Sequence, residues 1–315
     1  MKNIHSQQGV ILPLTLIILA ILTVMASVVM VRDRNKLAET EQMRDQWQAR
    51  LEIHNAEQRV MYAMLAGEQQ PGAYQLGNTL LLTDGTPVKL SNDVWVSIQD
   101  QAGLLSLRFM DRKLLTELFR HYLGPGSDVN TTQAIIDWQT PGGEVPINQT
   151  IIPRKALFRS LDELMLLPSI TPEIYNGRWN IVDQETQTTE VEALINLPKF
   201  GLRDLLTLSG QDHLNYAATP DILLQILYGF TADDIERLDR LKANANWRAV
   251  QSSFQSLGMT FGEGSMSPGV DYTIRFQYQG VKARGEYEIY VYSLPVPRIS
   301  WYFPDQYRYF TPIQP

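Results

Sequence analysis

Residues 10–31 read VILPLTLIILAILTVMASVVMV and contain no charged side chain. As an α-helix this stretch would be about 33 Å long at ~1.5 Å per residue, more than the ~30 Å hydrocarbon core of a bilayer. It is too long for the apolar core of an ordinary secretory signal, and Ala26-Ser27-Val28 is a poor cleavage site. The stretch therefore predicts a membrane-spanning helix, and an uncleaved single-pass anchor is the simplest interpretation.

The segment that follows, 32–66, continues the helical pattern on a polar background. Residues 32–65 contain no proline or glycine and are rich in Glu, Gln, Arg, Ala and Met, which favour helices. We therefore predict an amphipathic continuation of the first helix, ended by Gly67 and Pro71-Gly72. Its apolar positions recur at helical spacing and predict one stripe, of which the first three are candidate partner contacts: Met43, Trp47, Leu51, His54, Met61 and Leu65.

The rest of the chain predicts an α+β fold. Strand-like patterns occupy 67–102, where a hairpin around Asp84-Gly85 is expected, and return in 259–315, where Gln279-Gly280 turns between two alternating runs before an aromatic tail. Between them, 103–258 carries signals for short helices, namely the capping residues Asn130, Ser160, Thr171, Thr219 and Thr231. Because the flanking strands can share one sheet, we predict that 103–258 is an inserted all-α domain.

The composition argues against several classes of function. The 315-residue chain carries a net charge of −7, which disfavours nucleic-acid binding because such proteins neutralise phosphates with basic surfaces. It has no cysteine, so disulfides, thiolate nucleophiles and cysteine-based metal sites are excluded. His121 with Asp128 and Asp212 with His213 could be drawn as acid-base pairs, but surface helix ends explain them as well. We therefore predict a non-enzymatic protein with no catalytic residue.

Residues 7–14, QQGVILPL, resemble the processing site of prepilins. The resemblance implies that a prepilin peptidase cleaves between Gly9 and Val10, removes the leader 1–9 and methylates the new amino terminus at Val10. Residues 10–31 would then form a transmembrane and assembly helix. Leu14 would be the fifth residue of the processed chain, where typical pilins carry a glutamate that neutralises the amino terminus of a neighbour.

Three stretches beyond the leader resemble the large minor pseudopilin of type II secretion, the general secretion pathway protein K family. They read GLLSL at 103–107, AIIDW at 134–138 and FRSLDELMLLPSITPE at 158–173, and a further entry-like segment lies at 209–217. The match covers roughly 7–290 and is thin between 70 and 100. It implies a long N-terminal helix, a pseudopilin-like antiparallel sheet and an inserted SAM-like or helix-hairpin domain.

The same resemblance implies a function. The family lacks the glutamate of typical pilins, and its members cap the tip of the pseudopilus in protein export across the outer membrane. The partners would be the I-type and J-type minor pseudopilins, the major pseudopilin and the prepilin peptidase. The chain would cross the inner membrane once, with its C-terminal domain in the periplasm. Basic residues flank both ends of 10–31, so this orientation rests on the resemblance and not on charge.

A calcium site is known in this family, but the loop that would supply it differs here. After Asp137-Trp138 the chain reads QTPGGE, with Glu144 as its single carboxylate. Hard cations need several oxygen ligands, so no cofactor follows from this loop. Asp128, Asp183 and Glu185 are the alternative candidate ligands.

Two other functions remain open. Residues 161–174 resemble a helix-hairpin-helix, which would suit a membrane-anchored nucleic-acid-binding protein of the competence type. Such hairpins bind phosphate through glycine amides, and the sequence PSITP at 168–172 has no glycine. A minor pilin of a type IV pilus would share the leader and the apolar helix.

Overall fold

The structure is a computed structural model that contains two compact units, Met1–Leu51 and Glu52–Pro315. Gly9 and Val10, the predicted processing site, lie outside the residues that it describes. The described residues are 11–109, 111–142, 154–177, 200–209, 213–256, 265–290 and 296–305.

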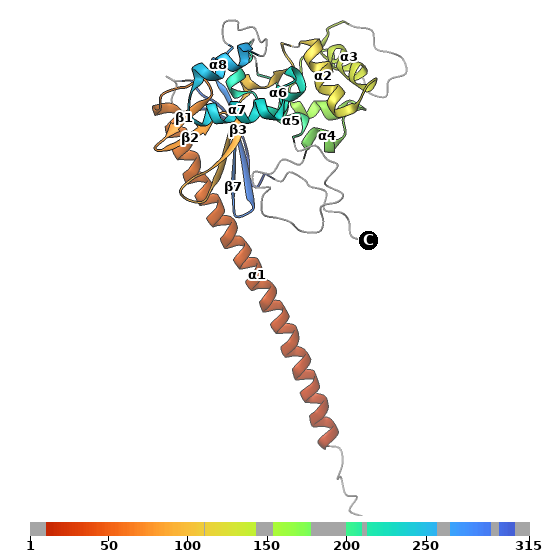
Figure 1. Cartoon of the computed structure of the whole chain (residues 1–315). Helices are drawn as coiled ribbons and strands as arrows, with labels where there is room; N and C mark the ends of the chain where they lie inside the picture. Colours follow the sequence, from red (N-terminus) through yellow and green to blue (C-terminus); the bar gives the residue numbers. More distant parts are fainter. Residues whose placement is uncertain are drawn as a thin grey trace, which may run out of the picture. The chain divides into compact units, whose positions relative to one another are not determined.

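One helix, α1 (Ile11–Ala66), passes through the boundary between the two units without a break (Figure 1). The prediction of one continuous helix over this stretch is confirmed. Its end falls where the sequence indicates, because the amide of Gly67 donates to the carbonyl of Ala63 at 2.9 Å and the chain then leaves the helix.

The second unit is built on a five-stranded antiparallel sheet in the order β3-β4-β7-β8-β9. The strands are β3 (Asp84–Lys89), β4 (Trp95–Asp100), β7 (Asp271–Tyr278), β8 (Val281–Glu288) and β9 (Arg298–Tyr302). A separate hairpin pairs β1 (Ala73–Leu76) with β2 (Thr79–Leu82). The predicted α+β class, with a long apolar N-terminal helix and an antiparallel sheet, is confirmed.

The predicted hairpin turn at Asp84-Gly85 is wrong. These two residues begin β3, and Asp84 is buried against Lys242. The tight turn lies earlier, at Gly77, whose φ of 58° falls in the left-handed region that glycine adopts most easily. The turn between β7 and β8 lies at Gln279-Gly280, as predicted, and both residues have positive φ.

The two faces of the sheet differ in chemistry. Residues directly opposite each other in an antiparallel pair share a face. Ile98 pairs with Ile274, which pairs with Gly285, and this apolar face also carries Tyr287. The other face is polar, where Gln99, Thr273 and Glu286 form a row across β4, β7 and β8, with the pair Arg275–Arg284 beside it.

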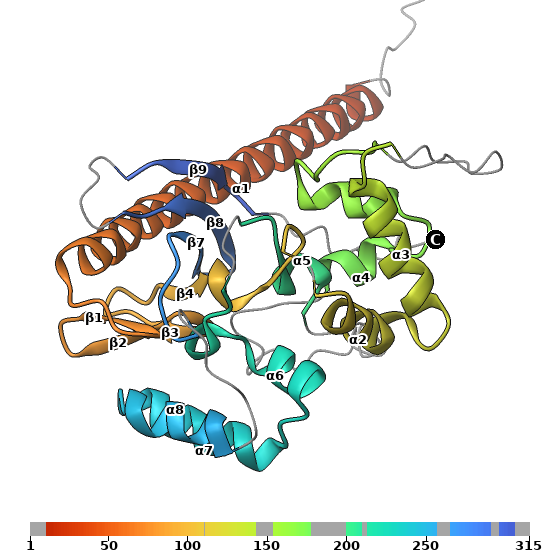
Figure 2. The same ribbon diagram turned by 90° about the horizontal axis from the view of Figure 1, so that it is seen from above.

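Both faces are covered. Tyr287 on the apolar face donates to Glu57 in the last turns of α1, which run beside β8 and β9 (Figure 2). On the polar face, Gln99 donates to the carbonyl of Ala218 and Arg275 to Asp204, both from the helical block. The sheet therefore lies between α1 and the block of helices.

The helical block lies in sequence between β4 and β7, which are neighbours in the sheet. Its described part is mostly helical, with one parallel pair of two-residue strands, β5 (Leu105–Ser106) and β6 (Leu206–Thr207). Its helices are η1 (Gln101–Gly103), α2 (Arg112–Leu123), α3 (Ser127–Gln139), η2 (Leu161–Leu166), α4 (Pro172–Asn176), α5 (Leu202–Leu205), η3 (Tyr216–Ala218), α6 (Asp221–Tyr228), α7 (Ala232–Ala243) and α8 (Trp247–Ser256).

The predicted caps have mixed outcomes. Thr171, Thr231 and Ser160 accept hydrogen bonds from the first turns of α4, α7 and η2, as predicted. Asn130 does not begin a helix, because α3 already starts at Ser127. Thr219 does not cap α6, because its hydroxyl donates to the carbonyl of Asn215 instead.

Candidate assembly surface

The apolar part of α1 is exposed along its whole described length. All side chains from Leu14 to Val31 are exposed, and Leu14 itself is 53% exposed. By length and composition the helix can cross a membrane, and none of its most apolar window is buried. A large aliphatic side chain gains ~1.5–3 kcal/mol when it leaves water, so such a surface belongs in lipid or against other apolar helices.

The stripe of Met43, Trp47 and Leu51 continues this exposure within the first unit. The three side chains are 62%, 65% and 59% exposed, and a spacing of four residues turns each about 40° from the last on an α-helix. The guanidinium of Arg50 lies 5.6 Å from the centre of the Trp47 ring. An apolar ridge with a cationic neighbour on a long helix suits contact with a second helix.

The predicted single stripe does not continue into the second unit. His54 is exposed, and Met61 and Leu65 are half-buried. The face of α1 that is buried here consists of small and β-branched residues with one methionine and one acid: Ile53, Ala56, Glu57, Val60, Ala63 and Met64. Counting large apolar residues missed this face because alanines supply much of it.

Glu57 fixes the end of α1 to the sheet. Glu57 is 2% exposed, and its carboxylate accepts a hydrogen bond from the Tyr287 hydroxyl at 2.7 Å and one from the Arg298 guanidinium. His54 lies 3.3 Å away on the same helix. Burial and the neighbouring Glu57 carboxylate raise the pKa of Tyr287, which therefore stays a hydrogen-bond donor. The signal in the sequence is a charged residue inside a run of small apolar positions.

The candidate metal ligands are not brought together in the described part of the chain. The buried carboxylate of Asp128 accepts from the amides of Val129 at 2.8 Å and Gly126 at 2.9 Å, and from Arg120 at 2.9 Å. These hydrogen bonds lower the pKa of Asp128, and the bond from the Val129 amide contributes most. Asp183, Glu185 and Glu144 lie outside the described residues. No group of three potential ligands occurs among the residues described, and the calcium site stays a prediction.

The drawn acid-base pairs do not carry a site either. Asp128 pairs with Arg120 rather than with His121, whose ring packs edge-on against Tyr122. His213 lies 3.3 Å from the carbonyl of Ser267, and Asp212 is outside the described residues. The absence of catalytic activity stays a prediction.

In comparisons with known proteins, no family model and no curated sequence matches the chain.

Proposed function

We propose that this chain is the minor pseudopilin that caps the tip of the type II secretion pseudopilus, in the general secretion pathway protein K family. In this role it is a structural subunit and not an enzyme. Its apolar helix anchors it in the inner membrane before assembly, with the second unit in the periplasm. Its partners are the I-type and J-type minor pseudopilins, the major pseudopilin and the prepilin peptidase.

One observation carries the proposal: a single unbroken helix joins an exposed apolar segment to the α+β unit. From Leu14 to Val31 this helix has no buried side chain, while from Ile53 to Met64 one face of it is part of the core of the second unit. A cleavable signal needs no such continuity with the folded domain. A subunit that is pulled out of a membrane into a fibre needs a continuous helix, because force on the apolar segment must reach the folded domain.

Leu14 supports the tip position within this proposal. In a fibre with a free amino terminus at Val10, a glutamate at the fifth residue would pair with the amino group of a neighbouring subunit. Leu14 cannot do this, so the chain suits a position that lacks that neighbour. The helical block between β4 and β7 would also obstruct a further subunit stacked above it.

The test is the intact mass of the full chain extracted from membranes of cells that hold a prepilin peptidase. We expect a mass lower by residues 1–9 and higher by one methyl group. The Gly9→Leu variant should have the mass of the unprocessed, full-length chain, because a larger side chain blocks the peptidase. Asn3→Leu, a control in the same leader, should be processed normally. Native protein that keeps Met1 would contradict the proposal.

A further inference from the structure

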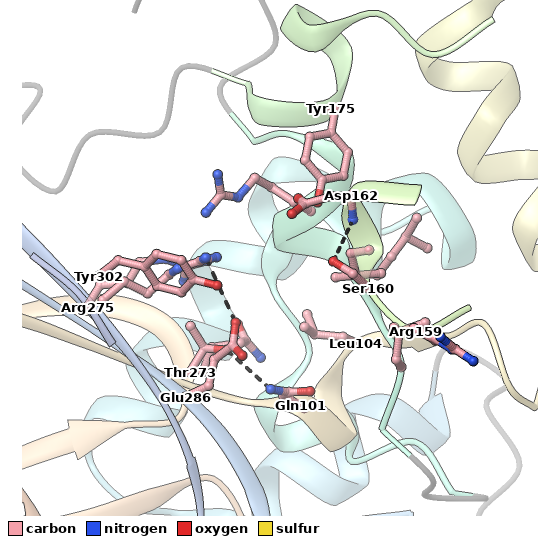
Figure 3. A pocket seen from close by; sticks show the side chains of 16 residues that line it. Gln101, Leu104, Arg159, Ser160, Asp162, Tyr175, Thr273, Arg275, Glu286 and Tyr302 are labelled. Carbon is pink, nitrogen blue, oxygen red and sulfur yellow. Dashed lines mark hydrogen bonds and ion pairs between the residues drawn. The ribbon is translucent and has the colours of Figure 1, made fainter. Parts of the chain in front are cut away.

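A cavity of about 360 Å³ lies between the polar face of the sheet and the helical block of the second unit (Figure 3). Its volume is within the ~300–1,000 Å³ that is usual for small-molecule sites. The sheet side supplies Thr273, Arg275, Arg284 and Glu286, and Tyr302 closes it from β9. The cavity shares no residue with the exposed helix of the first unit, and it goes beyond the proposed structural role.

Positive charge is in excess around this cavity. Four arginines line it, and the carboxylates are fewer: Asp162 and Glu286 line it, and Asp204 pairs with one of the arginines from behind. Among the described residues, four guanidinium groups at the cavity face three carboxylates, an excess of one positive charge, although the chain as a whole carries a net charge of −7. The four arginines are Arg159, Arg203, Arg275 and Arg284.

Arg284 is a largely buried cation of this cavity that has no hydrogen-bonded carboxylate among the described residues. Its side chain is 13% exposed, and the carboxylate within reach is Glu286 at 3.9 Å, too far for a hydrogen bond. The buried Nε of Arg284 has no hydrogen-bond acceptor among the described residues. Its guanidinium stacks on Tyr302, 4.4 Å from the ring centre. A buried guanidinium without a hydrogen-bonded counter-charge is costly, and an anionic ligand would remove that cost.

The other carboxylates at the cavity already have partners. Asp162 accepts from the Tyr175 hydroxyl at 2.6 Å, and Asp204 accepts from Arg275 at 2.5 Å. Neither is placed to rotate toward Arg284 without leaving a buried donor unpaired. The rest of the lining is mixed: neutral polar side chains, among them Gln99 and Gln101, alternate with an apolar patch. That patch consists of Leu104, Leu161, Leu206 and Leu208.

We propose that this cavity binds a ligand with one carboxylate on an apolar body, with Arg284 holding the carboxylate and the leucines contacting the body. The flat guanidinium fork of arginine matches a carboxylate in a bidentate pair. Two sources have this chemistry, namely a free organic acid and the C-terminal carboxylate of a peptide with an apolar last residue.

The test uses the full chain in detergent micelles and isothermal titration calorimetry, with empty micelles as the blank. N-acetyl-leucine mimics a peptide C-terminus, benzoate represents a free acid, and N-acetyl-leucinamide is the neutral match. We expect N-acetyl-leucine or benzoate to bind at least tenfold more tightly than the amide. The tighter of the two acids identifies the source. Equal affinity of acid and amide, or no saturable binding of either acid, would overturn the proposal.

Variants locate the binding. Arg284→Gln should weaken acid binding at least tenfold and leave the amide unchanged. Arg112→Gln, at an exposed arginine that donates to Gln133 on the helical block, should change neither. If Arg284→Gln fails to fold by circular dichroism, Arg284→Lys replaces it, and we expect weaker binding because the single ammonium loses the bidentate fork. Unchanged acid affinity in the folded variant would assign the ligand elsewhere.

Discussion

Gly103 marks the point where the chain passes from the sheet into the helical block, and no larger residue fits there. A Cβ atom on Gly103 would lie 2.1 Å from the carbonyl oxygen of Ala218 and 2.9 Å from the amide nitrogen of Thr219. Both are backbone atoms, so the contact cannot be relieved by rotating a side chain. The glycine of the 103–107 motif is therefore required by the close approach of η1 to η3.

We expect Gly103→Ala to lower the free energy of unfolding by about 3 kcal/mol or more, the upper end of the usual cost of overpacking, because the added Cβ meets backbone atoms. Gly77→Ala is the matched control. Gly77 has positive φ but no atom within 4 Å of an added Cβ, so its cost should be limited to ~1–2 kcal/mol for the left-handed backbone. Urea denaturation followed by tryptophan fluorescence measures both. An equal or smaller loss for Gly103→Ala would contradict this packing.

A buried ion pair joins the sheet to the helical block at another point. The Lys242 ammonium, fully buried on α7, lies 2.6 Å from the carboxylate of Asp84 on β3. Burial alone would raise the pKa of Asp84, but the Lys242 charge and hydrogen bonds outweigh it and lower the pKa below its ordinary value. Breaking such a pair by removing one partner usually costs ~3–5 kcal/mol.

Lys242→Met should therefore destabilise the protein by about 3–5 kcal/mol, and adding Asp84→Asn should restore a large part of that loss. The lowered pKa also gives a sign for pH dependence. As the pH falls, the Asp84 carboxyl takes up a proton at a higher pH in the unfolded chain than in the folded protein. The stability that ionised Asp84 contributes is therefore fully present above pH ~4 and is lost as the pH falls through the lower pKa of the folded state. Denaturation at a series of pH values should show a smaller acid loss in the double variant than in the wild type. If the double variant lost as much stability at acid pH as the wild type, the loss could not be assigned to Asp84.

At the scale of elements, the sequence predicts well where local chemistry decides the structure. The β7–β8 hairpin follows from alternating residues around Gln279-Gly280, and the start of α7 follows from the Thr231 cap. It predicts poorly where a distant segment decides. Alternation in β7 is typical of a sheet with one face in water, yet Arg275 is buried because the helical block covers that face. The cavity was missed for the same reason.

The contact between α1 and the sheet depends on Glu57. Glu57→Gln keeps the shape of the side chain but removes the negative charge that Tyr287 and Arg298 share. We expect a loss of about 1–3 kcal/mol, because bonds to a charged acceptor become bonds to a neutral one. Amide hydrogen exchange should become faster in residues 52–66. Glu68→Gln, just past the end of the helix, serves as the control and should leave exchange unchanged.

At the scale of the whole molecule, the two units differ in how many of their large apolar side chains are exposed to water. The second unit buries its large apolar side chains in cores such as those around Phe119 and Phe254. The first unit buries almost none: its described apolar side chains from Leu14 to Val31, and the stripe of Met43, Trp47 and Leu51, are exposed. The length and apolarity of this helix are plain in the sequence. The sequence does not show which face of residues 32–66 is left for a partner. In the second unit, that depends on which face of the helix the sheet covers.

The stripe should therefore matter for assembly and not for folding. We expect the triple variant Met43→Gln, Trp47→Gln, Leu51→Gln to unfold in urea like the wild type and to remain in the membrane fraction through residues 10–31. It should no longer co-purify with other subunits that carry an apolar N-terminal helix, because each lost contact removes ~1.5–3 kcal/mol of apolar burial. Asp45→Asn is the control, since Asp45 is exposed on the same helix and lies ~200° around it from Trp47, on the opposite face. If the control and the triple variant lose partners alike, the helix is recognised without regard to this face. If neither loses them, the contacts lie in residues 10–31 alone.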